Sequence, residues 1–415
     1  MIGRIAVLGG SSVYIPEFIL SVISHNINVK EIVLMGRRER KLDLVAKFCQ
    51  RILDASGFPA KVIGTTDLAE GVKGAKYVLN HIRVGGLDAR LRDEKLPPKY
   101  GMVGDESLGA GGFANALRTL PVVLDFARRI EEIVPDATFI NLTNPMGVVV
   151  EALTKYSKLA VLGACDLPGS YIKKVAKVLH TTPEELTVDY IGLNHLGWIQ
   201  DVRRNNRSVM GHVLDKLERH KEDGFDCELI ELFRMIPTRM VGLYFHCDDI
   251  LKEQKACSRF RAEVLQEAEK QILKLYEDQH LSEVPDLTRE RKAIWYEETI
   301  VPLIAALENR KDQELILCVR NGDSIRDLPE DASVEIPVNV SNRGIVPRKV
   351  GNCPHFLKGF YTSVKESDRL TVEAVRHKSY DLALQALVVN PLVPSLHAAR
   401  KYLDRIVKEE KIELH

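Results

Sequence analysis

The chain has 415 residues, with 58 Lys and Arg against 58 Asp and Glu. Because these charges balance, no overall field draws the protein to nucleic acid or to a membrane, and we expect a small-molecule partner. The N-terminus enters a strand at once without a basic segment, and no apolar run approaches the ~20 residues of a membrane span. We therefore expect a cytoplasmic protein.

The first half alternates short apolar strands with amphipathic helices. This alternation is typical of a parallel sheet with helices on both faces. The expected fold class is α/β, with a Rossmann-like, doubly wound dinucleotide-binding domain over residues 1–194. Strands are predicted at 3–8, 31–35, 61–65, 77–84, 138–142, 159–164 and 187–193, and helices at 17–24, 39–55, 114–133 and 147–156.

The pattern changes after Asn194, where long charged helices follow a predicted hairpin at Asn205-Asn206. The mixture predicts an α+β domain over residues 195–415 for substrate, metal and subunit contacts, with the ligand in the crevice between the halves. Helices are predicted at 212–221, 262–279, 289–309, 368–387 and 396–409, and strands at 315–319 and 334–340.

The first turn, Gly9-Gly10-Ser11-Ser12, is small enough for a pyrophosphate to approach backbone N–H groups at a helix N-terminus. It lacks the full three-glycine fingerprint, and small residues are also simply good turn formers. The second strand ends in Gly36-Arg37-Arg38, whereas an NAD site normally has an acidic residue there. Two guanidinium groups suit a 2′-phosphate, which slightly favours NADP over NAD. A solvated helix start explains the Arg pair almost equally well.

Cys165-Asp166-Leu167-Pro168 and Asn194-His195 each follow an apolar strand. A thiolate and an imidazole at such strand ends can bind one divalent metal beside a nicotinamide. Taken singly, Cys165 would be a buried structural thiol and His195 a core histidine. The other cysteines show no paired spacing and are expected to be reduced.

These motifs together resemble glycoside hydrolase family 4, the dinucleotide- and metal-dependent glycosidases, over nearly the whole chain. The resemblance implies the lactate/malate dehydrogenase-like fold, NAD or NADP as cofactor, and a homodimer or homotetramer. It also implies a divalent metal, manganese in that family, bound by Cys165 and His195. The matching residues are Gly9 to Ser12 with Pro16-Glu17, Arg83-Val84-Gly85-Gly86, Gly104-Asp105-Glu106, Gly111-Gly112, Thr143-Asn144-Pro145, Cys165 to Pro168, Gly192 to His195, Arg261-Ala262, Asn321-Gly322 and Leu370 to Ala374.

The resemblance implies transient oxidation at the sugar C3, which acidifies the C2 proton, then elimination of the C1 leaving group, addition of water and return of the hydride. Asp166 is the matched acid. In that family, Cys-Asp-x-Pro accompanies enzymes acting on 6-phospho-α-glucosides and Cys-Asn-x-Pro the β-linked counterparts. Asp166 therefore predicts an α-linked glucoside, phosphorylated at C6 or otherwise anionic.

Four further residues are expected to bind the substrate or cofactor. Arg83 and Arg261 can each grip an oxyanion with two hydrogen bonds, although either could instead be a structural ion pair. Asn144 matches the family position between cofactor and sugar, and its alternative role is turn formation before Pro145. Asn194 is expected at the sugar.

The pattern breaks where the family has its proton-abstracting Tyr, because Met240 occupies that position here. A thioether cannot take a proton from carbon. Tyr244 or Glu106 could serve instead, or the chemistry could differ. Two alternatives follow: a sugar oxidoreductase that stops at the 3-keto product, and a catalytically silent sugar- and dinucleotide-binding homologue. Ser11, Val13 and Asp105 also depart from the usual motifs, which indicates an outlying family member.

Overall fold

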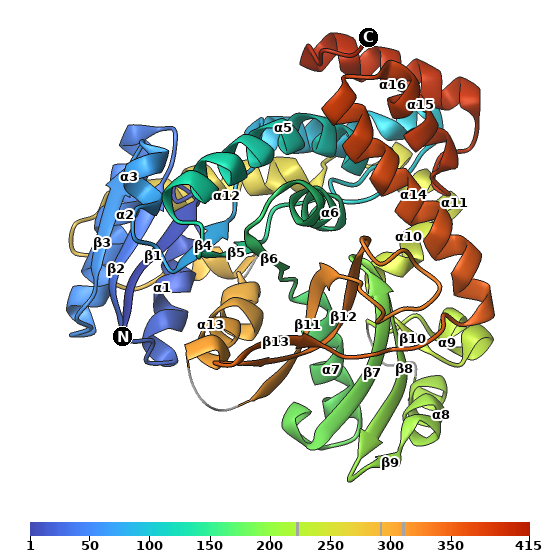
Figure 1. The fold of residues 1–415 in the computed structure, drawn as a ribbon, viewed down its shortest axis with the longest axis horizontal. Helices are drawn as coiled ribbons and strands as arrows, with labels where there is room; N and C mark the ends of the chain where they lie inside the picture. Colours follow the sequence, from blue (N-terminus) through green and yellow to red (C-terminus); the bar gives the residue numbers. More distant parts are fainter. Residues whose placement is uncertain (221–223, 291–292, 309–311) are drawn as a thin grey trace.

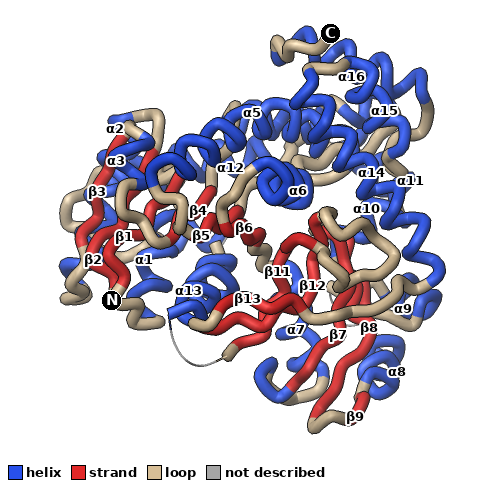
Figure 2. The backbone as a smooth tube through the Cα atoms, viewed as in Figure 1, coloured by secondary structure: helices blue, strands red, loops and turns tan. Residues whose placement is uncertain are grey.

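The computed structural model describes residues 1–220, 224–290, 293–308 and 312–415. Through these residues runs a 13-stranded sheet with the order β10-β8-β7-β12-β11-β6-β5-β4-β1-β2-β3, with β13 beside β12 and β9 beside β8 (Figure 1). Figure 2 shows the strands as a band that crosses the molecule, with helices on either side.

Six parallel strands make the N-terminal part of the sheet in the order 3-2-1-4-5-6, which is the order of a dinucleotide-binding fold. Their interiors are apolar and buried on both faces, as in β1, where Ile5 to Leu8 have no exposed surface. The predicted α/β class and doubly wound sheet are confirmed. The strands are β1 (Ile2–Leu8), β2 (Val29–Met35), β3 (Lys61–Thr65), β4 (Tyr77–Asn80), β5 (Thr138–Asn141) and β6 (Ala160–Gly163).

Helices cover both faces of the parallel strands. On one face, α1 (Ile15–Ser24), α2 (Glu39–Ala55) and α13 (Val301–Glu308) share a core with the side chains of Ile5 and Val7. On the other face, α3 (Leu68–Val72), α5 (Gly109–Ile133) and α6 (Met146–Tyr156) pack against Ala6 and Leu8. The alternation along β1 therefore separates the two helical layers.

The C-terminal strands are antiparallel and continue the same sheet. β11 (Gln313–Arg320) meets β6 at Cys318 and Gly163, and β12 (Ser333–Ser341) meets β7 (Leu186–Leu193) at Glu335 and Gly192. Because β7 pairs with these later strands, the sheet is shared by both halves of the chain; a division at residue 194 stays a prediction. The remaining strands are β8 (Leu196–Arg204), β9 (Arg207–Ser208), β10 (Ile236–Pro237) and β13 (Gly344–Pro347).

Two predicted helices differ from the structure. The helix expected at 289–309 is replaced by a 3-10 turn (Asp286–Glu290) and a π-helical turn (Tyr296–Ile300) that leads into α13; residues 291–292 and 309 lie outside the described residues. The helix expected at 368–387 is two helices, α14 (His355–His377) and α15 (Tyr380–Val389), because Lys378 adopts a left-handed conformation with φ 50°.

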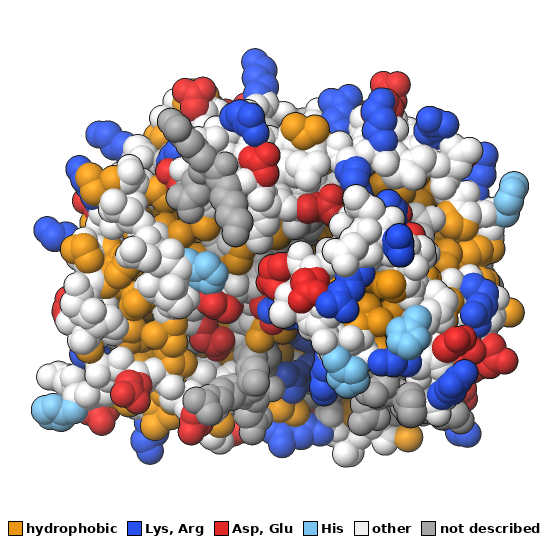
Figure 3. Space-filling view, turned by 90° about the horizontal axis from the view of Figure 1, so that it is seen from below, with side chains coloured by type: hydrophobic (Ala, Val, Ile, Leu, Met, Phe, Trp, Pro, Cys, Tyr) orange, Lys and Arg blue, Asp and Glu red, His pale blue; other side chains and the backbone are white. Residues whose placement is uncertain are grey.

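The remaining helices include those expected at 212–221, 262–279 and 396–409, of which residue 221 lies outside the described residues, and several short ones that the sequence pattern does not predict. They are α4 (Gly86–Lys95), α7 (Leu167–Val178), α8 (Met210–His220), α9 (Cys227–Phe233), α10 (Gly242–Phe245), α11 (Cys247–Ala256), α12 (Arg261–Tyr276) and α16 (Leu396–Glu410). α12 returns to contact α2 and α4, and α15 and α16 pack on α5. In the described ranges, no helix combines the length and apolarity needed to cross a bilayer. Figure 3 shows basic and acidic side chains interspersed over one face.

Candidate active site

The turn after β1 is held tightly between two neighbouring strands. The N–H groups of Gly9 and Gly10 both donate to Met35 O, at 2.9 and 2.8 Å. Gly9 has φ 89°, and a Cβ there would lie 2.3 Å from His81 O, so only glycine fits. Gly10 is similarly confined, since its Cβ would lie 2.6 Å from Leu34 Cβ. The chain can thus pass directly into α1 with Ser11 and Ser12 at the helix entrance.

Arg37 and Arg38 lie beside this turn. Gly36, which precedes them, approaches Ser11 so closely that a Cβ would lie 3.4 Å from its Oγ. Both arginines are exposed, and neither forms an ion pair with a residue that the structure describes. Arg38 is the N-cap residue of α2. Two guanidinium groups therefore remain open to solvent at the end of β2.

Cys165 and His195 come together although their strands are not neighbours. Cys165 lies two residues after the end of β6, and His195 occupies the turn between β7 and β8. The Cys165 Sγ atom lies 3.6 Å from the His195 Nε2 atom. His195 adopts a left-handed backbone with φ 64° in this tight turn. The strands β11 and β12 separate β6 from β7 in the sheet.

The electrostatics of this pair suit a metal. Burial lowers the pKa of His195 to about 4, with a smaller effect from Arg239, so its imidazole is neutral at neutral pH. Burial raises the pKa of the Cys165 thiol, and the charges of Glu335 and Asp166 raise it further. A thiolate here needs a nearby cation, and a neutral imidazole with a thiolate is a donor set that binds divalent ions. In the described ranges, no third His, Cys, Asp or Glu completes a ligand cluster.

Asp166 and Asn194 flank the two candidate ligands. Asp166 is the N-cap residue of α7 and is half-buried. Asn194 is buried, and its Nδ2 donates to Glu335 Oε1 at 2.8 Å. Burial raises the pKa of Glu335 to about 7, while the hydrogen bonds from Tyr190 and Asn194 lower it. The sequence interpretation missed Glu335, although a lone carboxylate inside an apolar strand was a signal for it.

Arg83 and Glu106 form an ion pair, so these two predicted residues are brought together. Arg90 also binds Glu106, at 2.8 Å, and reaches Glu94 at 2.7 Å. Glu94 in turn accepts from Ala262 N at 2.9 Å, at the start of α12. Arg261, the first residue of α12, is exposed. This chain of contacts fixes the start of α12 relative to the loop of Arg83.

Asn144 follows β5 and is linked to the same loops. Asn115 Nδ2 donates to Asn144 O at 3.0 Å and to Glu106 O at 2.9 Å. Thr143 Oγ1 donates to Ile82 O at 3.0 Å, just before Arg83. Arg83 and Asn144, which follow the carboxyl ends of β4 and β5, are therefore connected with Glu106, which lies just before α5.

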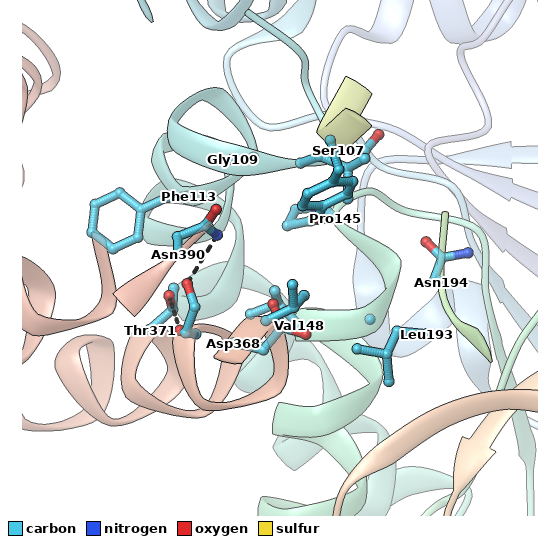
Figure 4. Close-up of a pocket in the computed structure, with 16 residues that line it drawn as sticks. Ser107, Gly109, Phe113, Pro145, Val148, Leu193, Asn194, Asp368, Thr371 and Asn390 are labelled. Atoms are coloured by element: carbon cyan, nitrogen blue, oxygen red, sulfur yellow. Dashed lines mark hydrogen bonds between the residues drawn. The ribbon is translucent and has the colours of Figure 1, made fainter. Parts of the chain in front are cut away.

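Tyr244 and Met240 occupy different surroundings. Met240 packs against the apolar cluster to which Cys165 also contributes. Tyr244 lines a pocket with Asn194 and Asp368, and Figure 4 shows Leu193 and Asn194 on one side of it and Asp368, Thr371 and Asn390 on the other. Burial raises the pKa of Tyr244, and the charges of Asp368 and Asp105 raise it further. In the part of the chain that the structure describes, its hydroxyl has no hydrogen-bond partner.

Comparison with known families matches both halves of the chain. A model of the family 4 glycosyl hydrolases matches residues 4–181, and a model of the family 4 glycosyl hydrolase C-terminal domain matches residues 190–393. A probable 6-phospho-beta-glucosidase of Bacillus subtilis (strain 168) is 33% identical over 99% of this chain and 97% of its own length.

Solved structures of family 4 glucosidases resemble this chain over its full length. The 6-phospho-beta glucosidase from Thermotoga maritima with manganese, NAD+ and glucose-6-phosphate is 30% identical, covers 100% of both chains and has a TM-score of 0.91. A 6-phospho-alpha-glucosidase from gut microorganisms, in complex with NAD and Mn2+, is 25% identical, covers 100% of both chains and has a TM-score of 0.90. Malate dehydrogenase from Cryptosporidium parvum, at 14% identity and a TM-score of 0.56, covers 91% of this chain and 99% of its own, and shares the fold.

Proposed function

Because the chain belongs to the family 4 glycosyl hydrolases, we propose that it is a phosphoglucosidase that uses NAD and a divalent metal, manganese as in its relatives. The observation that carries the proposal is the 3.6 Å approach of Cys165 Sγ to His195 Nε2, two polar atoms that follow the ends of the non-neighbouring strands β6 and β7. Manganese, NAD and a sugar phosphate occur together in a relative of the same fold.

The cofactors and the protein have separate tasks in this proposal. When bound, the dinucleotide accepts and returns a hydride, and the metal polarises sugar oxygens. Cys165 and His195 hold the metal, and the turn Gly9 to Ser12 holds the pyrophosphate. Arg83 and Arg261 bind the phosphate, while Asn144 and Asn194 orient the sugar. Asp166 gives a proton to the glycosidic oxygen.

Of the two candidate bases, Tyr244 is better suited than Glu106. The Glu106 carboxylate is held by Arg83 and Arg90, so its oxygens are already engaged. Tyr244 lines the pocket that also contains Asn194. Because burial raises the pKa of Tyr244, its hydroxyl would first have to ionise, and the phenolate would then take the C2 proton after C3 has been oxidised. We further propose that the enzyme works as a homodimer or homotetramer.

Two observations favour different anomers. Asp166 after Cys165 supports a 6-phospho-α-glucoside, which is our leading proposal. Three relatives that are 30 to 33% identical carry the name 6-phospho-beta-glucosidase or probable 6-phospho-beta-glucosidase, and they support a β-linked substrate as the second candidate. Purified protein with Mn2+ and NAD would be given the 4-nitrophenyl 6-phosphoglucosides of both anomers. Nitrophenol release from neither would refute the function, and release from the β-anomer alone would refute the α assignment.

Met240 keeps a third possibility open, a sugar oxidoreductase that releases a 3-keto product. The two reactions differ in what happens to the cofactor. A glycosidase regenerates NAD in every turnover, so reduced cofactor stays far below product. Stoichiometric accumulation of NADH without release of the aglycone would instead identify the oxidoreductase. Thermal stabilisation by ligands, with neither aglycone release nor NADH accumulation, would identify a catalytically silent binding homologue.

A further inference from the structure

Glu335 is a buried carboxylate without a cation. Its side chain is 1% exposed on β12, and no described Lys, Arg or His forms an ion pair with it. It accepts from Asn194 Nδ2 at 2.8 Å through Oε1 and from Tyr190 Oη at 2.7 Å through Oε2. A buried charge without a counter-ion is costly, so its position in the core calls for a reason.

The register places Glu335 between the two strands that carry Cys165 and His195. Glu335 lies opposite Gly192 on β7 and opposite Cys318 on β11, and Cys318 lies opposite Gly163 on β6. Its hydrogen bond to Asn194 holds the residue that immediately precedes His195. Glu335 therefore adds negative charge between the two ligand strands and fixes the turn of one of them.

We propose that Glu335 is a positioning residue of the metal centre, which orients His195 through Asn194 and supplies a negative charge that favours a divalent cation beside Cys165. This inference rests on the metal placement in the proposed function. Hydrogen-bonded groups behind metal ligands commonly change metal affinity by roughly 10–100-fold when they are replaced.

The substitution Glu335→Gln separates charge from geometry. A Gln amide oxygen can still accept from Asn194, and its NH2 group can donate to the Tyr190 hydroxyl, which then acts as an acceptor. Tyr190→Phe is the matched control because it keeps the carboxyl group at position 335 and removes one hydrogen bond. Mn2+ dissociation constants would be measured by electron paramagnetic resonance of free Mn2+, without sugar or NAD, together with the thermal unfolding of each metal-free protein.

We expect Glu335→Gln to bind Mn2+ roughly 10–100-fold more weakly while its metal-free form unfolds near the parent temperature. Tyr190→Phe should bind Mn2+ like the parent. Parental Mn2+ affinity in Glu335→Gln would overturn the inference. Should Glu335→Gln fail to fold, Asn194→Ala tests the positioning step, and parental affinity there would overturn it. Cys165→Ser separates the two proposals: if it binds Mn2+ like the parent, the metal site itself is wrong.

Discussion

Lys365 Nζ lies 3.0 Å from Asp368 Oδ2, in the core beneath the pocket that contains Tyr244. The same ammonium reaches Glu151 at 3.3 Å and donates to Ser333 Oγ at 2.9 Å. Lys365 is 1% exposed, and these contacts join α14 to α6 and β12. One buried cation thus anchors the helix that forms the far side of the pocket.

Lys365→Met should destabilise the protein strongly. It leaves Asp368 without its counter-ion and leaves buried Glu151 with only the more distant Arg369, at 4.0 Å, and breaking a buried pair costs about 3–5 kcal/mol. Urea unfolding followed by circular dichroism measures the change. Lys358→Met, which removes an exposed lysine of the same helix from its pair with half-buried Asp327, should have a much smaller effect. Equal losses for both variants would contradict the prediction.

Tyr244→Phe should slow proton exchange at the sugar C2. Removing a general base lowers the rate by roughly 10²–10⁴-fold, whereas the ring still packs against Phe360. Deuterium incorporation from D2O into the product reports the step by mass spectrometry. Tyr380→Phe, which loses a surface hydrogen bond to Asp404, is the control. Unchanged exchange in Tyr244→Phe combined with loss in Glu106→Gln would assign the base to Glu106.

Met240→Tyr tests the same step by restoring the family residue. If a tyrosine at position 240 places its phenol near the sugar C2, the rate of proton exchange at C2 should rise roughly 10²-fold, which is the lower limit for a positioned base. The quantity to compare is the exchange rate at saturating substrate in parent and variant. A variant that folds and binds glucose-6-phosphate but exchanges no faster would show that position 240 does not face the proton.

Arg83→Lys should weaken binding of glucose-6-phosphate by roughly 10-fold or more, because an ammonium cannot replace a two-pronged guanidinium contact with an oxyanion. Charge is kept, so the pair with Glu106 can persist and the fold should be preserved. Calorimetric titration measures the change, and Arg128→Lys, on the exposed face of α5, is the control. A parental dissociation constant would remove Arg83 from the phosphate site.

Arg37 and Arg38 allow a separate test of cofactor choice. If their guanidinium groups bind a 2′-phosphate, the double variant Arg37→Ala, Arg38→Ala should lose roughly 10-fold or more in NADP affinity and little in NAD affinity. Fluorescence titration with both reduced cofactors gives the two constants. If the affinities for NAD and NADP change equally, or do not change, the two arginines are only the solvated start of α2.

Local patterns were enough to predict the parallel half of the fold. The strand at 61–65 and the helix at 39–55 coincide with β3 and α2, since both are bounded by turns and have clear apolar periodicity. The helix expected at 289–309 was right only for α13, at its C-terminal end, because the chain before it forms 3-10 and π-helical turns that no local period distinguishes. The helix expected at 368–387 is interrupted by the left-handed conformation of Lys378, which could not be predicted because glycine is the residue that usually marks such a position.

In the candidate site, too, local motifs predict some features and not others. Cys165 and His195 were suggested by motifs, but their approach depends on β11 and β12, which come from much later in the chain and lie between the strands that carry them. Neither the ion pair of Arg83 with Glu106 nor the hydrogen bond of Asn194 to Glu335 could be predicted from spacing, because both join residues distant in sequence.

The continuous sheet has a consequence for any attempt to dissect the protein. A fragment ending at residue 194 would keep β6 and β7 but lose β11, the strand that borders β6, and β12, the strand that links β11 to β7. Unpaired backbone groups along such edges are templates for self-association. The separated halves should therefore aggregate when produced alone, and become tractable only when coexpressed so that each supplies the strands missing from the other.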